Sequence, residues 1–459
     1  MNFINRIWRC FILQFGKKLG LVLLALACIV LAVSASAEYY VELPANGVAV
    51  TNRITMNLPG ENPVIPGYSP ITGNPWSGRY YPILCSIDND PEAQPHWGVS
   101  SADILYEFPI QGDGSTRMLA LYMDTVPNYS GPVRSGRVIM SKIRQSWGAA
   151  LCFYGWQRKP FNIDQAMPEY DVEDFSNLLN NNNAYVRSRW NWPFFEGITG
   201  NYAKYYEENI DSEHKRPHHQ RVGLRNVLAQ FTQEPTMHPF RFTISGLDHG
   251  ANVTGLSVSY KTTNPAYVTS YKYNPMTNVY QRFSNGAEYI DGLNQSICEF
   301  SNILIIRTNI STYNNNAVRV MIQDYGQGVC EIFQNGKYIR GTWVRSDSTT
   351  TASEYGSPNF RMIFFDDMGN ELYMLPGKTA IMYINVDQPV IVQTSDYIQG
   401  ARQVGTPAPT ATPRPTRTPK PTRTPKPTRV PAAGAVLETP VPVQNPNQGG
   451  EEDSEWFGL

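Results

Sequence analysis

The sequence has 459 residues, a formal net charge of −1 and an aromatic content of 12%, including 27 tyrosines. So many aromatic residues indicate a folded body and exclude a chain that is disordered throughout. The balanced charge lacks the basic domain that is typical of a nucleic-acid-binding protein. About 370 residues remain between two atypical ends, a length that suggests two domains.

The first 37 residues have the three parts of a secretory leader. Four basic residues and no acid precede the apolar run LVLLALACIVLAV, and Ala35-Ser36-Ala37 follows as a cleavage site. We predict that residues 1–37 are a signal peptide or, if uncleaved, an N-terminal membrane anchor. Lipidation at Cys28 is a further alternative. In each case we expect the body outside the cytoplasm, secreted or anchored to the bacterial cell membrane or wall.

Residues 38–77 are rich in Pro, Gly and Asn and predict an extended lead-in. The strands expected after it are YYPILCSID, SADILYEFPI, TRMLALYMDTV and AALCFYGW. Between the last two, VIMSKIRQSW predicts an amphipathic helix, because Ile139, Ile143 and Trp147 recur at a spacing of four. Strands that alternate with helices predict an N-terminal α/β domain over residues 78–238.

The pattern becomes all-β from about residue 240. Asn-Gly pairs in FSNGAEY and IFQNGKYI predict tight hairpins, since both central residues of such turns need a positive φ. Residues 239–400 therefore predict a smaller C-terminal β-rich domain. The fold class expected for the body is α+β, with a mixed β/α layered domain followed by the β-rich one.

Residues 401–459 predict a basic, disordered tail rich in Pro and Thr. Its six cations recur with a strict period of three between Arg414 and Arg429, so a polyproline II helix would place them all along one edge. We interpret this segment as an extended, soluble stalk. Binding to an anionic wall polymer is the alternative.

Four cysteines lie after the leader, namely Cys85, Cys152, Cys298 and Cys330. None has the CxxC spacing of a zinc site. Pairing the first two and the last two would keep each disulfide within one domain. Free thiols packed as small hydrophobic side chains are an equally good interpretation.

Most catalytic templates are absent from the sequence. It contains no GxSxG elbow, P-loop, HExxH pair or Gly-rich dinucleotide turn. The densest group of histidines is EHKRPHHQ, with His214, His218 and His219. Pro217 breaks the helical spacing of the first two, so we do not expect a metal site there.

The stretch SGPVRSGR places two arginines three residues apart at the expected start of the helix. A helix start has free amides and a partial positive charge, and guanidinium is a planar fork that fits phosphate or carboxylate. Ser135 is the expected N-cap, and Arg117 opens the neighbouring strand. We predict an anion-binding site made of Arg117, Arg134, Ser135 and Arg137.

Acidic and amide side chains are expected around the same crevice. They form a predicted acidic cluster of Asp88, Asn89, Asp103 and Glu107. Carboxylates there could hold Mg²⁺ against a phosphate, which makes Mg²⁺ the one candidate cofactor, although none is required. They could equally neutralise the arginines, in which case the network would serve the fold alone.

The run from SPITGNP to YSGPVRSGR resembles the N-terminal part of the YerB-like lipoprotein family, a bacterial group of unknown function. The matching motifs are Asp88-Asn89, Ala102-Asp103, Tyr106-Glu107, Thr116-Arg117 and the block from Gly131 to Arg137. GQGVCEIFQNGKYIRGTW and YMLPGKTAIMYI resemble the family's C-terminal part, so the resemblance covers about residues 68–390. It implies an architecture and a place in the cell envelope, but no established activity.

Two positions depart from the family pattern, because His219 stands in place of an asparagine and Ala380 in place of a tryptophan. The order of strand acid, strand-end arginine and arginine-bearing loop is also similar to that of the LytR-CpsA-Psr transferases. Those secreted enzymes hold a polyprenyl pyrophosphate and its metal ion. This second similarity is one of fold only.

These observations predict an extracytoplasmic envelope protein that binds an anionic cell-wall polymer or precursor through an arginine-rich cleft. A metal-dependent enzyme acting on a phosphate-containing wall precursor, of the polyprenyl pyrophosphate type, is one alternative. A structural or protein-interaction module with an envelope protein as partner is the other. Nucleic acid is not an expected partner, and membrane contact would come through an uncleaved leader.

Overall fold

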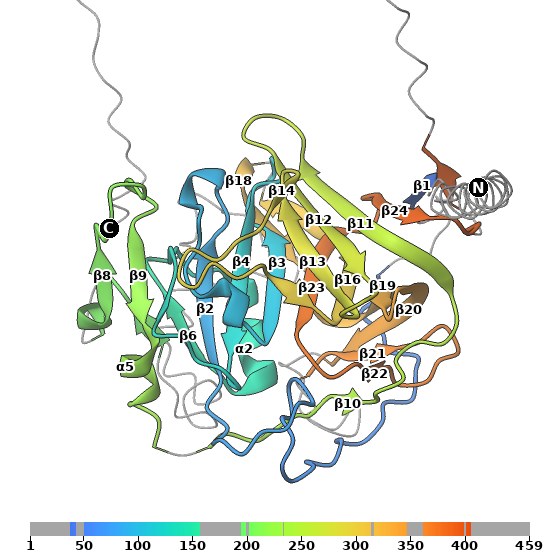
Figure 1. Ribbon diagram of the computed structural model, residues 1–459, viewed down its shortest axis with the longest axis horizontal. Coiled ribbons are helices and arrows are strands. Elements are labelled where there is room, and N and C mark those ends of the chain that lie inside the picture. The colour runs from blue at the N-terminus through green and yellow to red at the C-terminus, as the bar shows by residue number, and fades with distance from the viewer. Residues whose placement is uncertain are drawn as a thin grey trace, which may run out of the picture. The chain divides into compact units, whose positions relative to one another are not determined.

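Figure 1 shows the computed structural model of the chain. It describes residues 37–42, 50–156, 194–198, 202–232, 234–313, 316–346, 361–398 and 401–404. The leader before Ala37 and the tail beyond Val404 lie outside these residues, so the predictions made for both stay predictions. Among the described residues, no helix is both long enough and apolar enough to cross a membrane.

Eighteen strands form one mixed sheet, and its larger part has ten of them. The pairs β7–β6, β6–β2, β3–β23 and β23–β16 are parallel, and the other pairs are antiparallel. In spatial order the strands are β7 (Phe194–Glu196), β6 (Ala150–Phe153), β2 (Ile83–Asp88), β4 (Thr116–Tyr122), β3 (Ile104–Pro109), β23 (Thr379–Asn385), β16 (Asn302–Thr308), β19 (Gly326–Gln334), β20 (Lys337–Arg345) and β21 (Ile363–Phe365).

The second part of the sheet is antiparallel and joins the first through pairing of β11 with β20. Its strands are β25 (Arg402–Gln403), β1 (Ala37–Val41), β24 (Val390–Thr394), β11 (Ala251–Lys261), β12 (Tyr267–Asn274) and β13 (Val279–Ser284), with β14 (Ala287–Glu288) and β15 (Glu299–Phe300) both on β13.

Smaller elements complete the described fold. The short sheets are β5 (Tyr129–Ser130) with β9 (Gln220–Gly223) and β8 (Tyr206–Glu208), β10 (Arg241–Phe242) with β22 (Tyr373–Met374), and β17 (Ile310–Tyr313) with β18 (Asn316–Ile322). The helices are α2 (Val138–Trp147), α5 (Leu224–Leu228) and the 3₁₀ turns η1 (Pro91–Ala93), η2 (Val99–Ser101) and η3 (Ala203–Tyr205).

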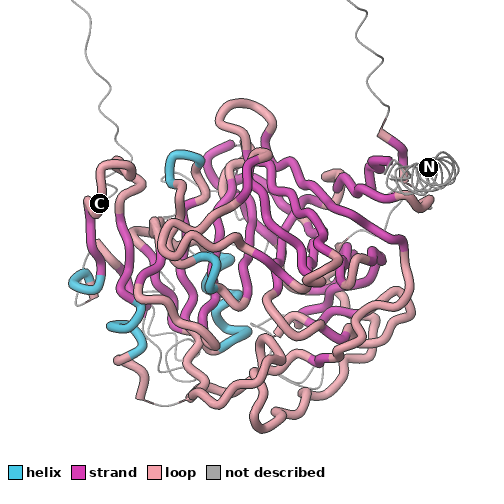
Figure 2. The backbone as a smooth tube through the Cα atoms, viewed as in Figure 1, coloured by secondary structure: helices cyan, strands magenta, loops and turns pink. Residues whose placement is uncertain are grey.

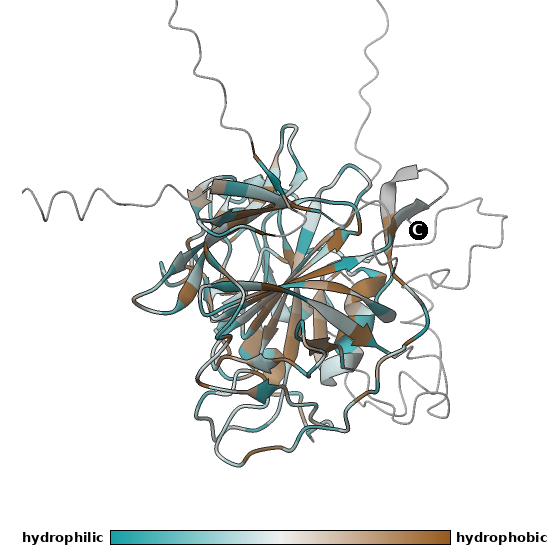
Figure 3. Cartoon of the chain, turned by 90° about the vertical axis from the view of Figure 1, so that its right-hand side faces the viewer, coloured by the Kyte–Doolittle hydropathy of each residue, from teal (hydrophilic) through white to brown (hydrophobic). Residues whose placement is uncertain are grey.

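The core lies on both faces of the ten-stranded part, whose central strands are fully buried. Along β2, alternate side chains serve opposite faces. Ile83, Cys85 and Ile87 pack with residues of the antiparallel part, whereas Leu84 packs with the side of α2 that carries Ile139, Ile143 and Trp147. Hydrophobic residues accordingly gather along the inner strands in Figure 3.

Local predictions are confirmed in several places. α2 spans the predicted ten residues, and its three predicted apolar side chains are buried. Asn285-Gly286 and Asn335-Gly336 have positive φ at both residues and close the hairpins β13–β14 and β19–β20. All four cysteines are free and buried, and Cys85 lies beside Cys152 in the register of β2 and β6.

The α+β fold class is wrong. Most regular structure among the described residues is strand, as Figure 2 shows. The α-helices of this part of the chain are one of ten residues and one of five. The physical reason lies in the layers. One face of the first strands is covered by the antiparallel strands β11–β13, where the sequence pattern suggested helices. β3 is flanked by β23, a strand that begins 275 residues later in the chain.

Candidate functional site

β2 and β4 bring the first predicted site residues together. Asp88, the last residue of β2, lies opposite Arg117 of β4 in the antiparallel register. The loop with the sequence SGPVRSGR crosses this end of β2. The Asp88 amide donates to the Pro132 carbonyl (2.8 Å), and the Arg134 amide donates to the Ser86 carbonyl (3.0 Å). Backbone hydrogen bonds therefore fix the arginine loop against the strand end.

Four side chains meet here and form what we call the Asp88 cluster: Asp88, Arg117, Arg134 and His218. Asp88 Oδ2 accepts a hydrogen bond from His218 Nδ1 (2.7 Å) and lies 2.9 Å from Arg134 Nε. The side chains of Asp88 and His218 are 4% and 9% exposed, whereas that of Arg134 is 26% exposed. The cluster thus combines a buried acid–histidine pair with an arginine that reaches the surface.

The charge of Asp88 follows from its surroundings. Burial by itself would raise the pKa of this carboxyl. The His218 hydrogen bond and the charges of Arg134 and Arg117 outweigh burial, and they lower the pKa below its ordinary value. Asp88 is therefore ionised at neutral pH. Its Oδ1 accepts from the Asp90 amide (3.2 Å), so both oxygens are engaged within the protein.

Arg117 is the least satisfied member of the cluster. It is 4% exposed and donates from Nη1 to the Ser135 carbonyl (3.1 Å). No carboxylate of the described residues forms an ion pair with it, although Asp88 and Asp90 attract its charge from farther away. Burial lowers the pKa of Arg117 to about 10, so it stays charged at neutral pH. Such burial is costly, because a charge leaves water without gaining a charged partner.

The other two members of the predicted anion site lie differently. α2 begins at Val138, three residues after Ser135, so Ser135 is not the N-cap of this helix. The Ser135 carbonyl instead accepts from Arg117. Arg137 directly precedes α2, is half-buried and has an interaction of its own. We therefore leave Arg137 out of the Asp88 cluster.

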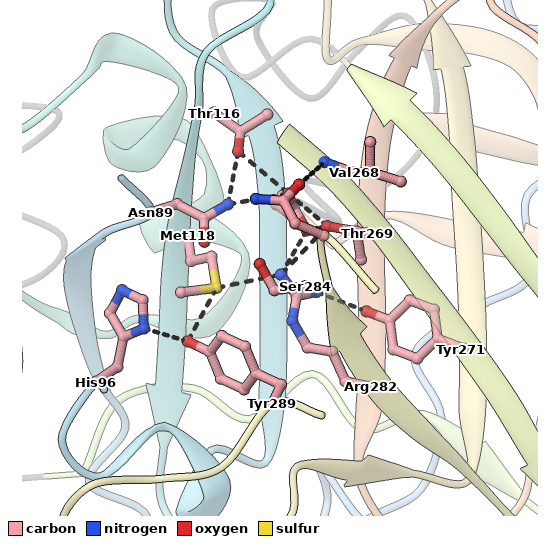
Figure 4. Close-up of polar contacts among 12 residues, drawn as sticks. Asn89, His96, Thr116, Met118, Val268, Thr269, Tyr271, Arg282, Ser284 and Tyr289 are labelled. Atoms are coloured by element: carbon pink, nitrogen blue, oxygen red, sulfur yellow. Dashed lines mark hydrogen bonds and ion pairs between the residues drawn. The ribbon is translucent and has the colours of Figure 1, made fainter. Parts of the chain in front are cut away.

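Asn89 and Glu107 belong to a second buried group, which we call the Glu107 network; Figure 4 shows many of its side chains around Arg282. Glu107 Oε2 accepts from Arg282 Nη2 (2.9 Å), and both side chains are 1% exposed. The other members are Asn89, Thr116, Thr269 and Tyr271. The network connects β3 and β4 to β12 and β13, so two predicted site residues hold the two parts of the sheet together.

Asp103 forms a third group with Asp124. Its Oδ2 accepts from the amides of Met123 (2.6 Å) and Asp124 (2.9 Å). Burial, followed by the Asp124 charge, raises the pKa of Asp103 well above its ordinary value. Asp124 accepts from the hydroxyls of Ser69 (2.6 Å) and Thr72, so this pair fastens the lead-in. The predicted acidic cluster is thus divided among three places.

Two histidines lie at the site although the sequence analysis did not assign them to it. His218 pairs with Asp88, and its signals were the histidine-rich stretch EHKRPHHQ and the match of Pro217 and His218 to the family pattern. His96 is fully buried, with Nε2 donating to the Asp88 carbonyl and Nδ1 accepting from the Tyr289 hydroxyl (2.7 Å). Burial lowers the pKa of His96 to about 4, so this ring is neutral at pH 7. No local pattern marked His96.

The predicted acidic residues do not converge on one place in the described structure. In the part of the chain that the structure describes, no group of three or more His, Cys, Asp or Glu side chains is placed to hold a metal ion. Mg²⁺ needs convergent oxygen ligands, and here Asp88, Asp103 and Glu107 belong to separate groups. The Asp88 cluster combines one carboxylate with two guanidinium groups and one imidazole.

Comparison with known proteins confirms the resemblance seen in the motifs. Residues 71–234 match the N-terminal domain, and residues 256–381 the C-terminal domain, of a family described as proteins of unknown function (DUF3048). The chain belongs to this family. Together the two matches cover most of the described body.

The chain is similar to a named protein and to a protein of known crystal structure. The protein named "Putative lipoprotein YerB" of Bacillus subtilis (strain 168) is 25% identical to the chain over 301 residues, which are 65% of this chain and 80% of that protein. A crystal structure of YerB protein from Bacillus subtilis superposes with a TM-score of 0.55 at 21% identity, covering 71% of this chain and 99% of that one. The second similarity shows a shared fold.

Proposed function

We propose that this chain is an extracytoplasmic envelope protein that binds an anionic group of a wall polymer or wall precursor through the Asp88 cluster. Two observations support the location, namely the leader-like residues 1–37 and the name of the Bacillus subtilis relative, a lipoprotein. Attachment to the membrane would then follow from a leader that is retained or lipidated.

Arg117 is the observation that carries the binding proposal. A buried guanidinium normally has a carboxylate partner, because desolvation otherwise destabilises the fold. Arg117 has one neutral carbonyl, and the nearest acids are engaged elsewhere. Asp90, for example, accepts from the Glu92 amide (3.0 Å) and the Tyr267 hydroxyl (2.9 Å). A bound anion would supply the negatively charged partner that Arg117 lacks.

Arg134 would supply the geometry of recognition. Its Nε lies 2.9 Å from Asp88 Oδ2 without forming a hydrogen bond, and its two Nη groups form none with the other described residues. The charge of Asp88, which His218 holds in place, thus keeps the guanidinium beside it and leaves the fork of donors for a ligand. Two oxygens of one phosphate or carboxylate fit such a fork. Lysine, with a single charged nitrogen, could not replace it.

The test is calorimetric titration of the purified protein with inorganic pyrophosphate and with a short polyprenyl pyrophosphate, each with Mg²⁺ and with EDTA. We expect binding in EDTA, weakened at least about tenfold by Arg134→Lys. Arg402→Lys is the matched control, because Arg402 also pairs with one carboxylate, Glu42 (3.2 Å), but on the surface.

The outcomes separate the three functions. Binding that Arg134→Lys weakens and Arg402→Lys does not would support the anion site. Binding only when Mg²⁺ is present would favour the metal-dependent enzyme. If neither pyrophosphate binds, or if Arg134→Lys lowers only the melting temperature, the cluster serves the fold and the anion-binding proposal is wrong.

A further inference from the structure

A separate cavity lies where the lead-in meets the short ribbon of β10 and β22, which Figure 1 shows below the main sheet. Its volume is about 590 Å³, within the range of ligand-binding pockets. One wall is formed by residues 59–73 and another by residues 239–244. Nearly all of these residues lie outside the two family matches, and none belongs to the Asp88 cluster.

The walls consist of rings and branched side chains that face water. Ile244 is 91% exposed, Ile65 59% and Tyr68 51%. Single exposed apolar residues are ordinary, but several around one concavity mark a binding surface. Proline rings supply much of the remaining wall: Pro59, Pro63, Pro70, Pro239 and Pro376. Because proline is stiff, the cavity is largely formed before any ligand arrives.

Two polar groups of the cavity could orient a ligand. Arg241 Nη2 donates to the Tyr373 hydroxyl oxygen (2.5 Å), and its guanidinium lies 4.5 Å from the ring centre. With its oxygen engaged, the Tyr373 hydroxyl keeps its hydrogen for a ligand carbonyl. The second group is the Glu61 carboxylate, which is 38% exposed and is shared with His238 (3.1 Å) and Arg361 (3.9 Å).

We infer that this cavity binds a proline-rich peptide that is in the polyproline II conformation and carries a basic residue. Such a helix has no internal hydrogen bonds, so its carbonyls are free to accept from Tyr373. Its proline rings pack on the exposed faces of Tyr68 and the wall prolines. The peptide is already stiff, so binding costs little conformational entropy. A lysine or arginine on it would complement Glu61.

Other ligand classes leave parts of the cavity unmatched. An acyl chain would bury the Tyr373 hydroxyl and the Glu61 carboxylate without partners, which is costly. An acidic polymer would meet the negative charge of Glu61, and Arg241, the cation that lines the cavity beside it, is already engaged with Tyr373 and Glu371 (3.9 Å). A sugar would place hydroxyl groups against Ile65 and Ile244. The peptide alone matches apolar walls, a hydroxyl donor and a carboxylate together.

The experiment is fluorescence anisotropy of the full-length protein with a labelled peptide of sequence PTPKPTPKPT. A second peptide, GTGKGTGKGT, has the same charges but no polyproline II preference. We expect the first to bind and the second to bind at least about tenfold more weakly. A third peptide with glutamate in place of lysine should also bind more weakly, because it opposes Glu61.

Matched variants assign the binding to the cavity. Ile244→Ala should weaken binding by a factor of about three to ten, that is by about 1 kcal/mol. Met276→Ala is the control, since Met276 is also 91% exposed and does not line the cavity. Neither truncation touches the core, so both variants should fold. The inference fails if neither peptide binds, if the glycine peptide binds equally well, or if both variants behave alike.

Discussion

Two arginines of this protein are both buried, but they differ in their hydrogen-bond and charge partners. Arg282 of the Glu107 network donates to a carboxylate, a threonine and a tyrosine, and every partner lies inside the protein. Arg117 of the Asp88 cluster donates to one carbonyl. Burial alone would lower the pKa of either guanidinium. Glu107 and Tyr271 reverse that effect for Arg282 and raise its pKa, whereas burial prevails for Arg117.

This difference teaches which buried charge serves structure and which is open to a ligand. A closed network, in which the charges are paired internally, stabilises the contact between two parts of a sheet. It offers no unpaired charge to a ligand, although Arg282 Nε and Asn89 Oδ1 form no hydrogen bond. In an incomplete cluster some hydrogen-bond donors have no acceptor, which destabilises the fold. Such a loss of stability persists where the cluster serves a function, such as binding a ligand. Residues that are adjacent in the sequence, such as Asp88 and Asn89, can therefore have different roles.

The largest expected effect comes from opening the closed network. Glu107→Gln removes the charge that faces Arg282 and leaves that arginine buried and unpaired. We expect the free energy of unfolding to fall by about 3–5 kcal/mol, measured by urea denaturation at pH 7. Glu299→Gln is the control, because Glu299 is only half-buried and should change stability by less than about 1 kcal/mol. Equal effects at the two positions would contradict the comparison.

A smaller effect is expected where the two groups touch. His96 lies between them, hydrogen-bonded to the Asp88 carbonyl and to Tyr289, whose ring lies 5.0 Å from the Arg282 guanidinium. Its pKa is about 4 in the folded protein and about 6.5 in an unfolded chain. The unfolded state therefore binds the proton first, and stability is lost as pH falls from about 6.5 toward 4. The loss should reach about 3 kcal/mol.

Urea denaturation of wild type and His96→Gln between pH 7 and 4 checks this slope. The variant should lose the part of the slope that His96 supplies, because that imidazole is gone. His219, whose pKa is also lowered by burial, keeps its own contribution. Asp88 has a lowered pKa too, but its contribution disappears only below pH of about 4, outside this window. His249 is the control of opposite sign, since Asp367 and Asp248 raise its pKa and its stabilisation is lost as pH rises. An unchanged slope in His96→Gln would contradict the assignment.

The sequence indicated parts of the Asp88 cluster because they are local. Asp88 ends a strand, Arg117 lies at the start of the third predicted strand, and Arg134 stands in a Gly/Pro loop after it. His218 could not be placed, because it reaches Asp88 from 130 positions away. Pro217 was weighed as a helix breaker and, together with His218, as a match to the family pattern. Neither interpretation indicated where the strand that follows His218 lies.

Glu107 shows the opposite failure. Alternation correctly predicted a strand, and it put the carboxylate on the polar side, which we took to be the side of the crevice. That side faces Thr269 and Arg282 of β12 and β13, which cover it. Periodicity reports which residues share a face, but the layer that packs on the face comes from distant sequence. For the same reason the predicted helical layers proved to be a second set of strands.

The smallest expected change in stability sharpens the comparison most. Arg117→Met keeps the volume of the side chain and removes a charge that has no ion-pair partner among the described residues. Replacing such a charge by an apolar group is often neutral or stabilising, so we expect the free energy of unfolding to change by less than about 1 kcal/mol. Arg282→Met should cost about 3–5 kcal/mol, because it leaves the Glu107 carboxylate buried alone. Urea denaturation of both variants measures the contrast. If Arg117→Met is as destabilising as Arg282→Met, Arg117 is satisfied within the fold and the Asp88 cluster is as closed as the Glu107 network. If it is nearly neutral yet abolishes pyrophosphate binding, the fold retains this arginine for its ligand.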